Sequence, residues 1–322
     1  MKRVLCIGAA LQDIYLLDHD DLVATKVGGM ASLGKVVPGS KVDIDRMYFE
    51  VGGGGLNAAV TLARNGHEVI FMGNVAHDAA GDAVMRVLDR ESIDNSYVGF
   101  VERGGTGASV ILLDKLSGER TVLTYRGASA KYSNFDENDL DLIQPDWLYI
   151  TTLRGDMETL ERFLIKAHDI GAKVMLNPGI KELEEARRLM KLLAYVDVLL
   201  VNKEEASRLV PGTTLTELAY HLGGYVPVAL ITDGGMGGVV NEATAQEMYR
   251  FGIYEDVKVV DATGAGDAFG SGFLAAYAEG ASLEGAVRFG SANATAVVQE
   301  IGANTRALYG DEVLHMMPMQ KI

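Results

Sequence analysis

Three small residues, Gly264, Ala265 and Gly266, stand immediately before a carboxylate, Asp267, and an apolar pattern with helical spacing covers residues 265–279. The start of a helix offers unpaired N–H groups and the positive end of the helix dipole, and small residues let an anion such as phosphate approach closely. A carboxylate at this point would repel the anion, so Asp267 is better suited to accept the proton of an incoming hydroxyl. An acidic first-turn residue that only complements the dipole is the alternative.

A second glycine-rich stretch, GGGGLN, runs from Gly52 to Asn57. It lacks the G-x-G-x-x-G spacing of dinucleotide-binding sites, because position 57 is an asparagine. No G-x-x-x-x-G-K-[ST] sequence occurs in the chain, which excludes a phosphate loop of that kind. The four glycines predict a close approach of the backbone to a ligand, with a simple hinge or turn as the alternative.

The elements that position these motifs alternate between β-rich runs and helical patterns from about residue 50 onward. This alternation predicts an α/β fold, with a mostly parallel central sheet flanked by helices. We expect strands at residues 4–8, 69–73, 147–151, 173–177, 196–202 and 226–232. We expect helices near residues 55–66, 79–91, 156–170, 181–193, 203–210, 265–279 and 283–299.

Two segments, residues 13–50 and 97–127, interrupt the alternation and are expected to form a small β appendage. The second holds two alternating runs on either side of KLSGER, which predicts a hairpin with Ser117 and Gly118 at its turn. No internal repeat and no long linker is found. Residues 1–322 are therefore expected to form one domain.

The composition is that of a globular protein, with 48% hydrophobic residues and a formal net charge of -15. This charge argues against broad binding to nucleic acid or to an anionic membrane surface. Cys6, the only cysteine, lies in the apolar run VLCIG and is expected to be a buried thiol. With no secretory signal and no run of about 18 apolar residues, a cytoplasmic location is expected.

Two stretches, VVDATGAGDAFGSGF at residues 259–273 and VGGGGLNAAVTLARNGHEVIFMGNVAHDAAG at residues 51–81, together resemble the signature regions of the PfkB family of carbohydrate kinases, also called ribokinase-like kinases. The resemblance covers nearly the whole chain. It implies a ribokinase-like fold with a small β lid, made here by the two interrupting segments. It also implies ATP-dependent transfer of a phosphoryl group to a hydroxyl.

The resemblance gives the G-A-G-D motif two roles. It implies that Asp267 is the catalytic base, which takes the proton of the attacking hydroxyl. It implies that Gly264, Ala265 and Gly266 form the anion hole for the transferred group. Both roles agree with the argument from helix termini, since a loose transition state needs positioning and charge stabilisation more than a strong base.

Two cation sites are also implied. NKEE at residues 202–205 is similar to the family's N-x-x-E motif, so Asn202 and, through water, Glu205 would organise Mg²⁺ and the phosphates. A plain helix start is the alternative, since Asn caps helices and Glu favours a first turn. Asp261 and Thr263 resemble a monovalent-cation site, for K⁺ in many members, although the loop IGANTRAL that would complete it departs from the family pattern.

The nucleotide site is implied by ITDGGMGGVV, which is similar to the family's T-x-G-x-x-G segment. Thr232, Gly234 and Gly237 would then contact ATP, with a glycine-rich hairpin as the alternative. Asn293 in GSANATAVV would lie near the adenine, with a polar position on a surface helix as the alternative.

For the acceptor, Asp13, Gly53 and Asn57 match positions that hold sugar hydroxyls in the family. Such side chains suit a polyol, because a missing hydroxyl would leave buried polar groups without partners. The familiar ribokinase pattern has a lysine where this chain has Gly54, so ribose is not established as the substrate.

Three arginines bear on the same question. Arg154 follows a predicted strand at a position where ribokinases tend to have an acidic sugar ligand, so it could meet a phosphate or carboxylate of the acceptor. A solvated arginine is the alternative. The same two interpretations apply to Arg103 and Arg126, which lie on the expected lid.

The leading hypothesis is a kinase that uses ATP and Mg²⁺ to phosphorylate a primary hydroxyl of a sugar or sugar-like compound. A nucleoside kinase and a sugar-phosphate kinase are the alternatives among enzymes. A regulator that binds nucleotide or sugar without catalysis is the alternative from a different class, and the intact Asp267 and Glu205 speak against it. Family members often dimerise through the lid, which would also protect its strand edges.

Overall fold

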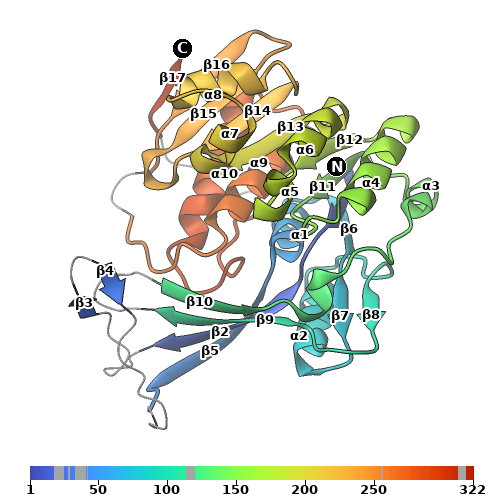
Figure 1. The fold of residues 1–322 in the computed structure, drawn as a ribbon, viewed down its shortest axis with the longest axis vertical. Coiled ribbons are helices and arrows are strands. Elements are labelled where there is room, and N and C mark those ends of the chain that lie inside the picture. Colours follow the sequence, from blue (N-terminus) through green and yellow to red (C-terminus); the bar gives the residue numbers. More distant parts are fainter. Residues whose placement is uncertain are drawn as a thin grey trace.

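The computed structural model describes residues 1–17, 25–27, 30–32, 41, 43–113, 120–254, 257–310 and 317–322. A nine-stranded sheet crosses the main body in the order β17-β16-β15-β14-β13-β12-β11-β1-β6 (Figure 1). Its strands are β1 (Arg3–Ile7), β6 (Glu68–Met72), β11 (Trp147–Ile150), β12 (Lys173–Leu176), β13 (Val198–Asn202), β14 (Val228–Thr232), β15 (Gly238–Glu242), β16 (Glu247–Phe251) and β17 (Met319–Lys321).

The sheet is mostly parallel, as predicted. Strands β6, β1, β11, β12, β13 and β14 run parallel to one another, and all six match the predicted strands to within two residues at each end. Strands β15, β16 and β17 extend the sheet in antiparallel pairs. The sequence pattern does not predict these three strands, because runs such as GVVNE and EMYRF are short and mix polar with apolar residues.

Helices cover both faces of this sheet (Figure 1). One face is covered by α1 (Gly54–Arg64), α2 (Ala79–Arg90), α9 (Ala265–Ala278) and α10 (Leu283–Val297). The other is covered by α3 (Leu140–Ile143), α4 (Met157–Ile170), α5 (Ile180–Glu184), α6 (Ala186–Leu192), α7 (Lys203–Leu209) and α8 (Leu215–Leu222). Short 3₁₀ helices are η2 (Gly127–Ala130), η3 (Glu137–Asp139), η4 (Leu193–Tyr195) and η5 (Gly234–Met236).

The alternation of side chains along each strand explains the two cores. In β1, Val4 and Cys6 pack under α1 and α9, whereas Leu5 and Ile7 pack under the helices of the opposite face. Cys6 is fully buried, as expected. No helix in the described part of the chain is long and apolar enough to cross a membrane.

A smaller four-stranded sheet projects from the main body in the order β10-β9-β2-β5 (Figure 1). Its strands are β2 (Leu11–Leu17), β5 (Arg46–Gly52), β9 (Gly107–Leu113) and β10 (Arg120–Tyr125). Strands β9 and β10 pair as an antiparallel hairpin, and the predicted turn residues Ser117 and Gly118 lie outside the described residues.

Two further strand pairs lie outside both large sheets. They are β3 (Thr25–Val27) with β4 (Met30–Ser32), and β7 (Asn74–Ala76) with β8 (Gly99–Val101). Strand β8 falls within the segment 97–127, yet it pairs in parallel with β7 and does not join the small sheet. The segment is thus divided between two sheets.

The carboxyl ends of the parallel strands meet at one edge of the main sheet, as they must in such a fold. Gly8 follows β1, Thr151 follows β11, and a Cβ placed on Gly8 would lie 2.0 Å from the Thr151 hydroxyl and 3.1 Å from the Gly55 nitrogen. The first turns of α1 and α9 also meet here, since a Cβ on Gly54 would lie 3.2 Å from Oδ1 of Asp267. This edge brings both glycine-rich motifs together.

Candidate active site

The predicted anion hole forms the start of α9. Gly264 is the N-cap residue with φ of 77°, and a Cβ at this position would lie 2.5 Å from Cβ of Ala303, so only glycine fits. Ala265 and Gly266 begin the helix, where first-turn N–H groups have no partner within the helix. A Cβ on Gly266 would meet no atom within 4 Å, so the space in front of it is open. The helix start therefore has room for an anion.

The carboxylate of Asp267 is held by a chain of side-chain amides. Nδ2 of Asn57 donates to Oδ2 of Asp267 at 2.8 Å, and Nδ2 of Asn304 donates to Oδ1 of Asn57 at 2.9 Å. Asn304 also donates to the Val51 carbonyl at 3.0 Å. Burial raises the pKa of Asp267, and the hydrogen bond from Asn57 opposes this rise. The network fixes the orientation of the carboxylate.

The four-glycine run brings α1 against the chain's own backbone. Gly53 is the N-cap of α1 with φ of 103°, and a Cβ there would lie 2.4 Å from the carbonyl oxygen of Ala9. A Cβ on Gly54 would lie 3.2 Å from both Oδ1 of Asp267 and Cβ of Thr151. The close approach that the sequence analysis expects toward a ligand is thus made toward other parts of the protein, including the candidate base.

Asp13 is buried on β2, facing the same region. Gly52 leaves room for its carboxylate, because a Cβ there would lie 2.5 Å from Oδ2 of Asp13. Burial raises the pKa of Asp13 to about 7, a hydrogen bond with Ser109 opposes the rise, and the charges of Asp261 and Asp267 add to it. Asp13 therefore lies close enough to both acids to feel their charge.

The predicted monovalent-cation residues leave one carboxylate oxygen unsatisfied. Oδ1 of Asp261 accepts hydrogen bonds from the backbone nitrogen and the hydroxyl of Thr263, at 2.9 and 2.6 Å. Oδ2 of Asp261 and the hydroxyl of Tyr15 are both buried without a partner in the described part of the protein. Burial, and then the charges of Asp261 and Asp13, raise the pKa of Tyr15. A buried carboxylate oxygen without a donor fits a cation site.

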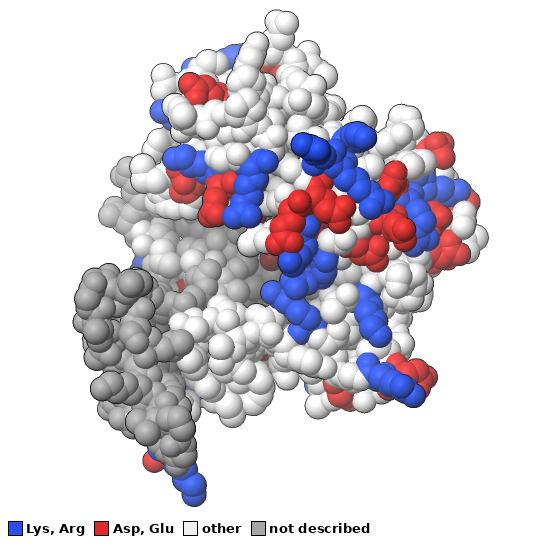
Figure 2. All heavy atoms as spheres, in the orientation of Figure 1, with Lys and Arg blue, Asp and Glu red and all other residues white. Residues whose placement is uncertain are grey.

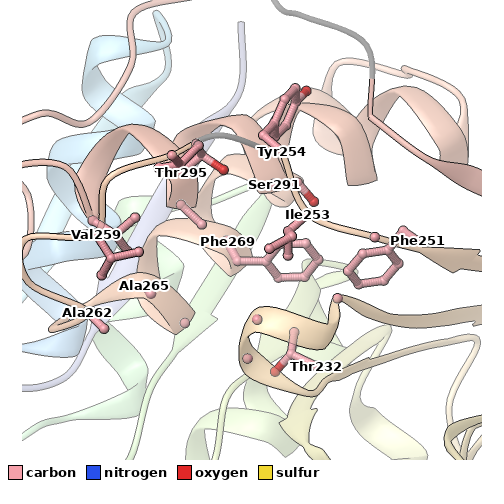
Figure 3. Close-up of a pocket in the computed structure, with 18 residues that line it drawn as sticks. Thr232, Phe251, Ile253, Tyr254, Val259, Ala262, Ala265, Phe269, Ser291 and Thr295 are labelled. Carbon is pink, nitrogen blue, oxygen red and sulfur yellow. The ribbon is translucent and has the colours of Figure 1, made fainter. Parts of the chain in front are cut away.

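A cavity of 370 Å³ lies beside the start of α9 (Figure 3). Thr232, Gly234 and Gly237 of the predicted nucleotide segment line it, and so do Ala265 and Gly266 of the predicted anion hole. Most of the other lining residues are apolar, as Figure 3 shows. A mostly apolar cavity beside an open helix start suits a flat aromatic base with a phosphate chain attached.

The structure places Asn293 away from this cavity. Its side chain is fully buried, Nδ2 donates to the Ala268 carbonyl at 2.7 Å, and Oδ1 accepts from the Leu308 nitrogen at 2.8 Å. The neighbours Ser291 and Thr295 line the cavity instead. Asn293 does not line the cavity, because the helical repeat turns this side chain toward α9, and its place near an adenine stays a prediction.

The NKEE motif starts α7 with a reciprocal pair of hydrogen bonds. The side chain of Asn202 accepts from the Glu205 nitrogen at 2.9 Å, and Oε2 of Glu205 accepts from the Asn202 nitrogen at 2.8 Å. Burial raises the pKa of Glu205. The alternative of a helix start is therefore realised, and Oε1 of Glu205 remains available for a water ligand of Mg²⁺.

The arginines fall into two groups. Arg154 follows β11 with φ of 63°, and its backbone nitrogen donates to the Thr152 hydroxyl at 3.1 Å. Arg126 lies between β10 and η2, and burial, followed by the charge of Arg154, lowers its pKa. Arg103 is exposed in the loop before β9. The structure thus brings Arg126 and Arg154 within electrostatic reach of each other.

Two residues of the site escape the sequence analysis. Asn304 lies in a loop without periodicity, where a single asparagine gives no sign of its partner Asn57. Tyr15 alternates along β2 as any buried aromatic residue would. The only sign of Asn304 in the sequence is that its loop follows α10. In the fold, this loop returns to the start of α1.

We predict that Asp13→Asn stabilises the free protein in a pH-dependent way. The folded-state pKa of about 7 lies above the ordinary value of 3.8, so the carboxyl binds its proton more tightly when folded. Asp13 then lowers stability progressively as the pH rises from about 4 to 7, by on the order of 4 kcal/mol at full ionisation. Thermal unfolding at pH 4 to 8 in tetramethylammonium buffers should show the variant's advantage growing over this range.

The exposed acid Asp82, in the first turn of α2, offers a matched control. Asp82→Asn should show no such growing advantage. An equal gap between Asp13→Asn and wild type at pH 4 and pH 8 would contradict the prediction, because the burial of the charge would then not be the cause.

Known proteins similar to this chain include kinases of sugars and of nucleosides. The family model described as "pfkB family carbohydrate kinase" matches residues 1–308. A ribokinase of Bacillus subtilis is 30% identical over 255 residues, which cover 78% of this chain and 82% of that protein. A nucleoside kinase of Methanocaldococcus jannaschii is 26% identical over 327 residues, which cover 100% of this chain and 99% of that protein.

Among solved structures, that of Arabidopsis thaliana ribokinase complexed with ribose and ATP is similar to this chain with a TM-score of 0.76. The two are 24% identical, and the match covers 95% of each chain. This likeness shows a shared ribokinase-like fold. On the fold and on the match over residues 1–308, the chain belongs to the pfkB family of carbohydrate kinases.

Proposed function

We propose that this protein is an ATP-dependent kinase that phosphorylates a primary hydroxyl of a sugar or sugar-like acceptor. The observation that carries the proposal is the chain of hydrogen bonds from Asn304 through Asn57 to Asp267, next to an open helix start that borders an apolar cavity. This arrangement offers a base and an anion site within one helical turn of each other. Transfer of a phosphoryl group to a hydroxyl needs both.

On the donor side, the base of ATP occupies the cavity between Thr232 and Thr295, with its phosphates toward Gly266. The first-turn N–H groups of α9 receive the transferred phosphoryl group, and the helix dipole stabilises its charge. Mg²⁺ held through water by Glu205 would supply positive charge between the phosphates. K⁺ at Asp261 would supply the charge that its unpartnered oxygen lacks.

On the acceptor side, Asp13 and Gly53 border the space for the sugar hydroxyls. Asp267 takes the proton of the attacking hydroxyl, and Asn57 holds the carboxylate in position. The raised pKa of Asp267 makes it a better proton acceptor than an ordinary aspartate. Closure of the small sheet over the acceptor would exclude water and so limit hydrolysis of ATP.

The alternatives differ in the acceptor. A nucleoside kinase would use the same ATP site and the same catalytic carboxylate. The similarity of the chain to a nucleoside kinase supports this alternative. A sugar-phosphate kinase would need cations at the acceptor site. A regulator without catalysis would not need a carboxylate held in position through Asn57 and Asn304, which argues against this alternative.

We predict that Asp267→Asn lowers kcat by about 10²- to 10⁴-fold, because the amide cannot accept the proton. Coupled measurement of ADP release with a panel of ribose, fructose, 2-keto-3-deoxygluconate, fructose 6-phosphate and nucleosides checks the change. Asp82→Asn, which alters another first-turn acid, should leave kcat unchanged. Full turnover by Asp267→Asn would contradict the role of Asp267 as the base. Only the alternative, an acidic first-turn residue that complements the helix dipole, would then remain.

We predict that Thr295→Phe raises KM for ATP by about tenfold or more, because the larger ring fills part of the nucleotide cavity (Figure 3). The KM for the acceptor should stay the same, since Thr295 lies on the donor side. Thr295→Ser keeps the hydroxyl and serves as the control. An unchanged KM for ATP in the phenylalanine variant would show that the nucleotide does not bind in this cavity.

We propose further that the protein dimerises through the small sheet. Its two edge strands, β5 and β10, carry exposed apolar side chains, among them Phe49 at 53% and Leu123 at 57% exposure. Exposed apolar edge strands pair readily with another chain. Sedimentation velocity should find a dimer that Leu123→Asp converts to a monomer. The control Tyr220→Asp, at an exposed position on α8, should remain dimeric, and a monomeric wild type would end this proposal.

A further inference from the structure

Two arginines at the acceptor side have no anionic partner. Within the described residues, the guanidinium groups of Arg126 and Arg154 make no ion pair or hydrogen bond, although the chain has 44 acidic and 29 basic residues. Other arginines are paired, such as Arg64 with Glu91 at 2.8 Å and Arg188 with Glu161 at 2.7 Å. What distinguishes Arg126 and Arg154 is that they are two cations within electrostatic reach of each other, with no carboxylate partner.

Arg126 lies at the end of a row of paired residues that crosses the small sheet, starting from Gly52 beside the proposed acceptor site. Gly52 pairs with Leu11, and Leu11 pairs with Gly107. The Arg126 carbonyl oxygen lies 2.9 Å from where a Cβ of Gly107 would stand, so Arg126 continues the row. Strands are about 4.8 Å apart, so the row spans about 14 Å. One end of the row is next to Gly53, and the other is Arg126.

Arg154 is reached along a second path from the same point. Thr151 lies against Gly54, which borders Asp267, and Arg154 is three residues further along the chain. Three residues span at most about 11 Å, so the arginine side chain can reach the acceptor space. Figure 2 shows Lys and Arg side chains gathered in the middle of this face, where Figure 1 draws the inner end of β10 beside the main body.

The loop that carries Arg154 is held by a buried acid with other partners. Glu182 is 1% exposed and accepts hydrogen bonds from the Thr152 hydroxyl and the Gly155 nitrogen, each at 2.8 Å, and from the Gly179 nitrogen at 2.9 Å. Its donors are thus uncharged groups. The acid fixes the loop without neutralising Arg154 through a direct contact.

A buried tyrosine adds an independent sign of a missing ligand. Tyr132 is 1% exposed, and its hydroxyl has no partner in the described part of the protein. Burial raises its pKa, the charges of Arg154 and Arg126 oppose the rise, and the charge of Glu182 adds to it. Both arginines therefore lie within electrostatic reach of the hydroxyl, together with the acid that holds the loop. An unpartnered hydroxyl beside two unpaired guanidinium groups offers several donors to one oxyanion.

The geometry points to an anion subsite, formed by Arg126 and Arg154 with Tyr132, that binds a carboxylate or phosphate group of the acceptor. The inference rests on the proposed kinase function and deepens it, since the acceptor would carry a hydroxyl at Asp267 and an anionic group at the far end. Sugar acids and sugar phosphates have this chemistry, and neutral sugars and nucleosides do not.

Binding measurements on the full chain test the subsite directly. Isothermal titration uses fructose 6-phosphate as the phosphate arm, 2-keto-3-deoxygluconate as the carboxylate arm, and fructose and ribose as the neutral arm. Arg154→Ala and Arg126→Ala should each weaken binding of at least one anionic compound by about tenfold or more and leave the neutral compounds unchanged. Arg154→Lys should restore part of the loss, because an ammonium keeps the charge without the two-pronged geometry.

Arg187→Ala, at an exposed arginine of α6, is the matched control and should bind like wild type. Equal binding of both anionic compounds by wild type and the two alanine variants overturns the subsite, and so does a preference of wild type for neutral compounds. If wild type prefers neutral compounds and phosphorylates a neutral sugar in a reaction that depends on Asp267, the kinase function is supported and the anionic acceptor is contradicted. If no acceptor is phosphorylated, the kinase function is contradicted, and the titrations still test the subsite.

Discussion

One hydrogen bond, from Asn57 to Asp267, joins two helix starts that are 210 residues apart in the chain. It can form only because the parallel sheet brings the first turns of α1 and α9 to the same edge, and because Gly54 has no side chain to separate them. A half-buried carboxylate without a donor would be costly, so the amide stabilises the fold as well as the site. Asn304 holds Asn57 in turn, which makes the loop after α10 part of the same constraint.

The same edge gathers negative charge. Burial raises the pKa of Asp13, and the charges of Asp261, Glu50 and Asp267 add to the rise, so this pKa reaches about 7. Oδ2 of Asp261 has no protein partner to offset this cost. A cation bound there would lower the pKa of Asp13 and let its carboxylate accept hydrogen bonds at neutral pH. A cation at Asp261 and an acceptor at Asp13, both of which we propose, would therefore be coupled through charge.

The sequence predicts the parts of this architecture that depend on local pattern. The six parallel strands and the helix starts at Gly54 and Ala265 follow from periodicity and glycine placement. Contacts between distant segments leave no local sign. Asn293 looks like a surface residue with a free amide, yet its amide ties α10 to α9. Tyr15 looks like an ordinary core residue, yet its hydroxyl stands unpartnered near Asp261. In each case the sequence gives the residue type, and only the topology gives the partner.

The nucleotide side and the acceptor side of the proposed site differ in polarity and charge. The proposed donor side is lined mainly by apolar groups and borders the start of α9, so it could bind a flat base and an anion without a local cluster of arginines. The proposed acceptor side has the acids Asp13 and Asp267, and an anionic acceptor would meet repulsion there. The net charge of -15 adds little to this repulsion, because salt screens charges beyond about 8 to 10 Å. The repulsion of an anionic acceptor therefore comes mainly from the nearby acids. Arg126 and Arg154 would act at the same short range, on the anionic end of an acceptor whose hydroxyl faces Asp267.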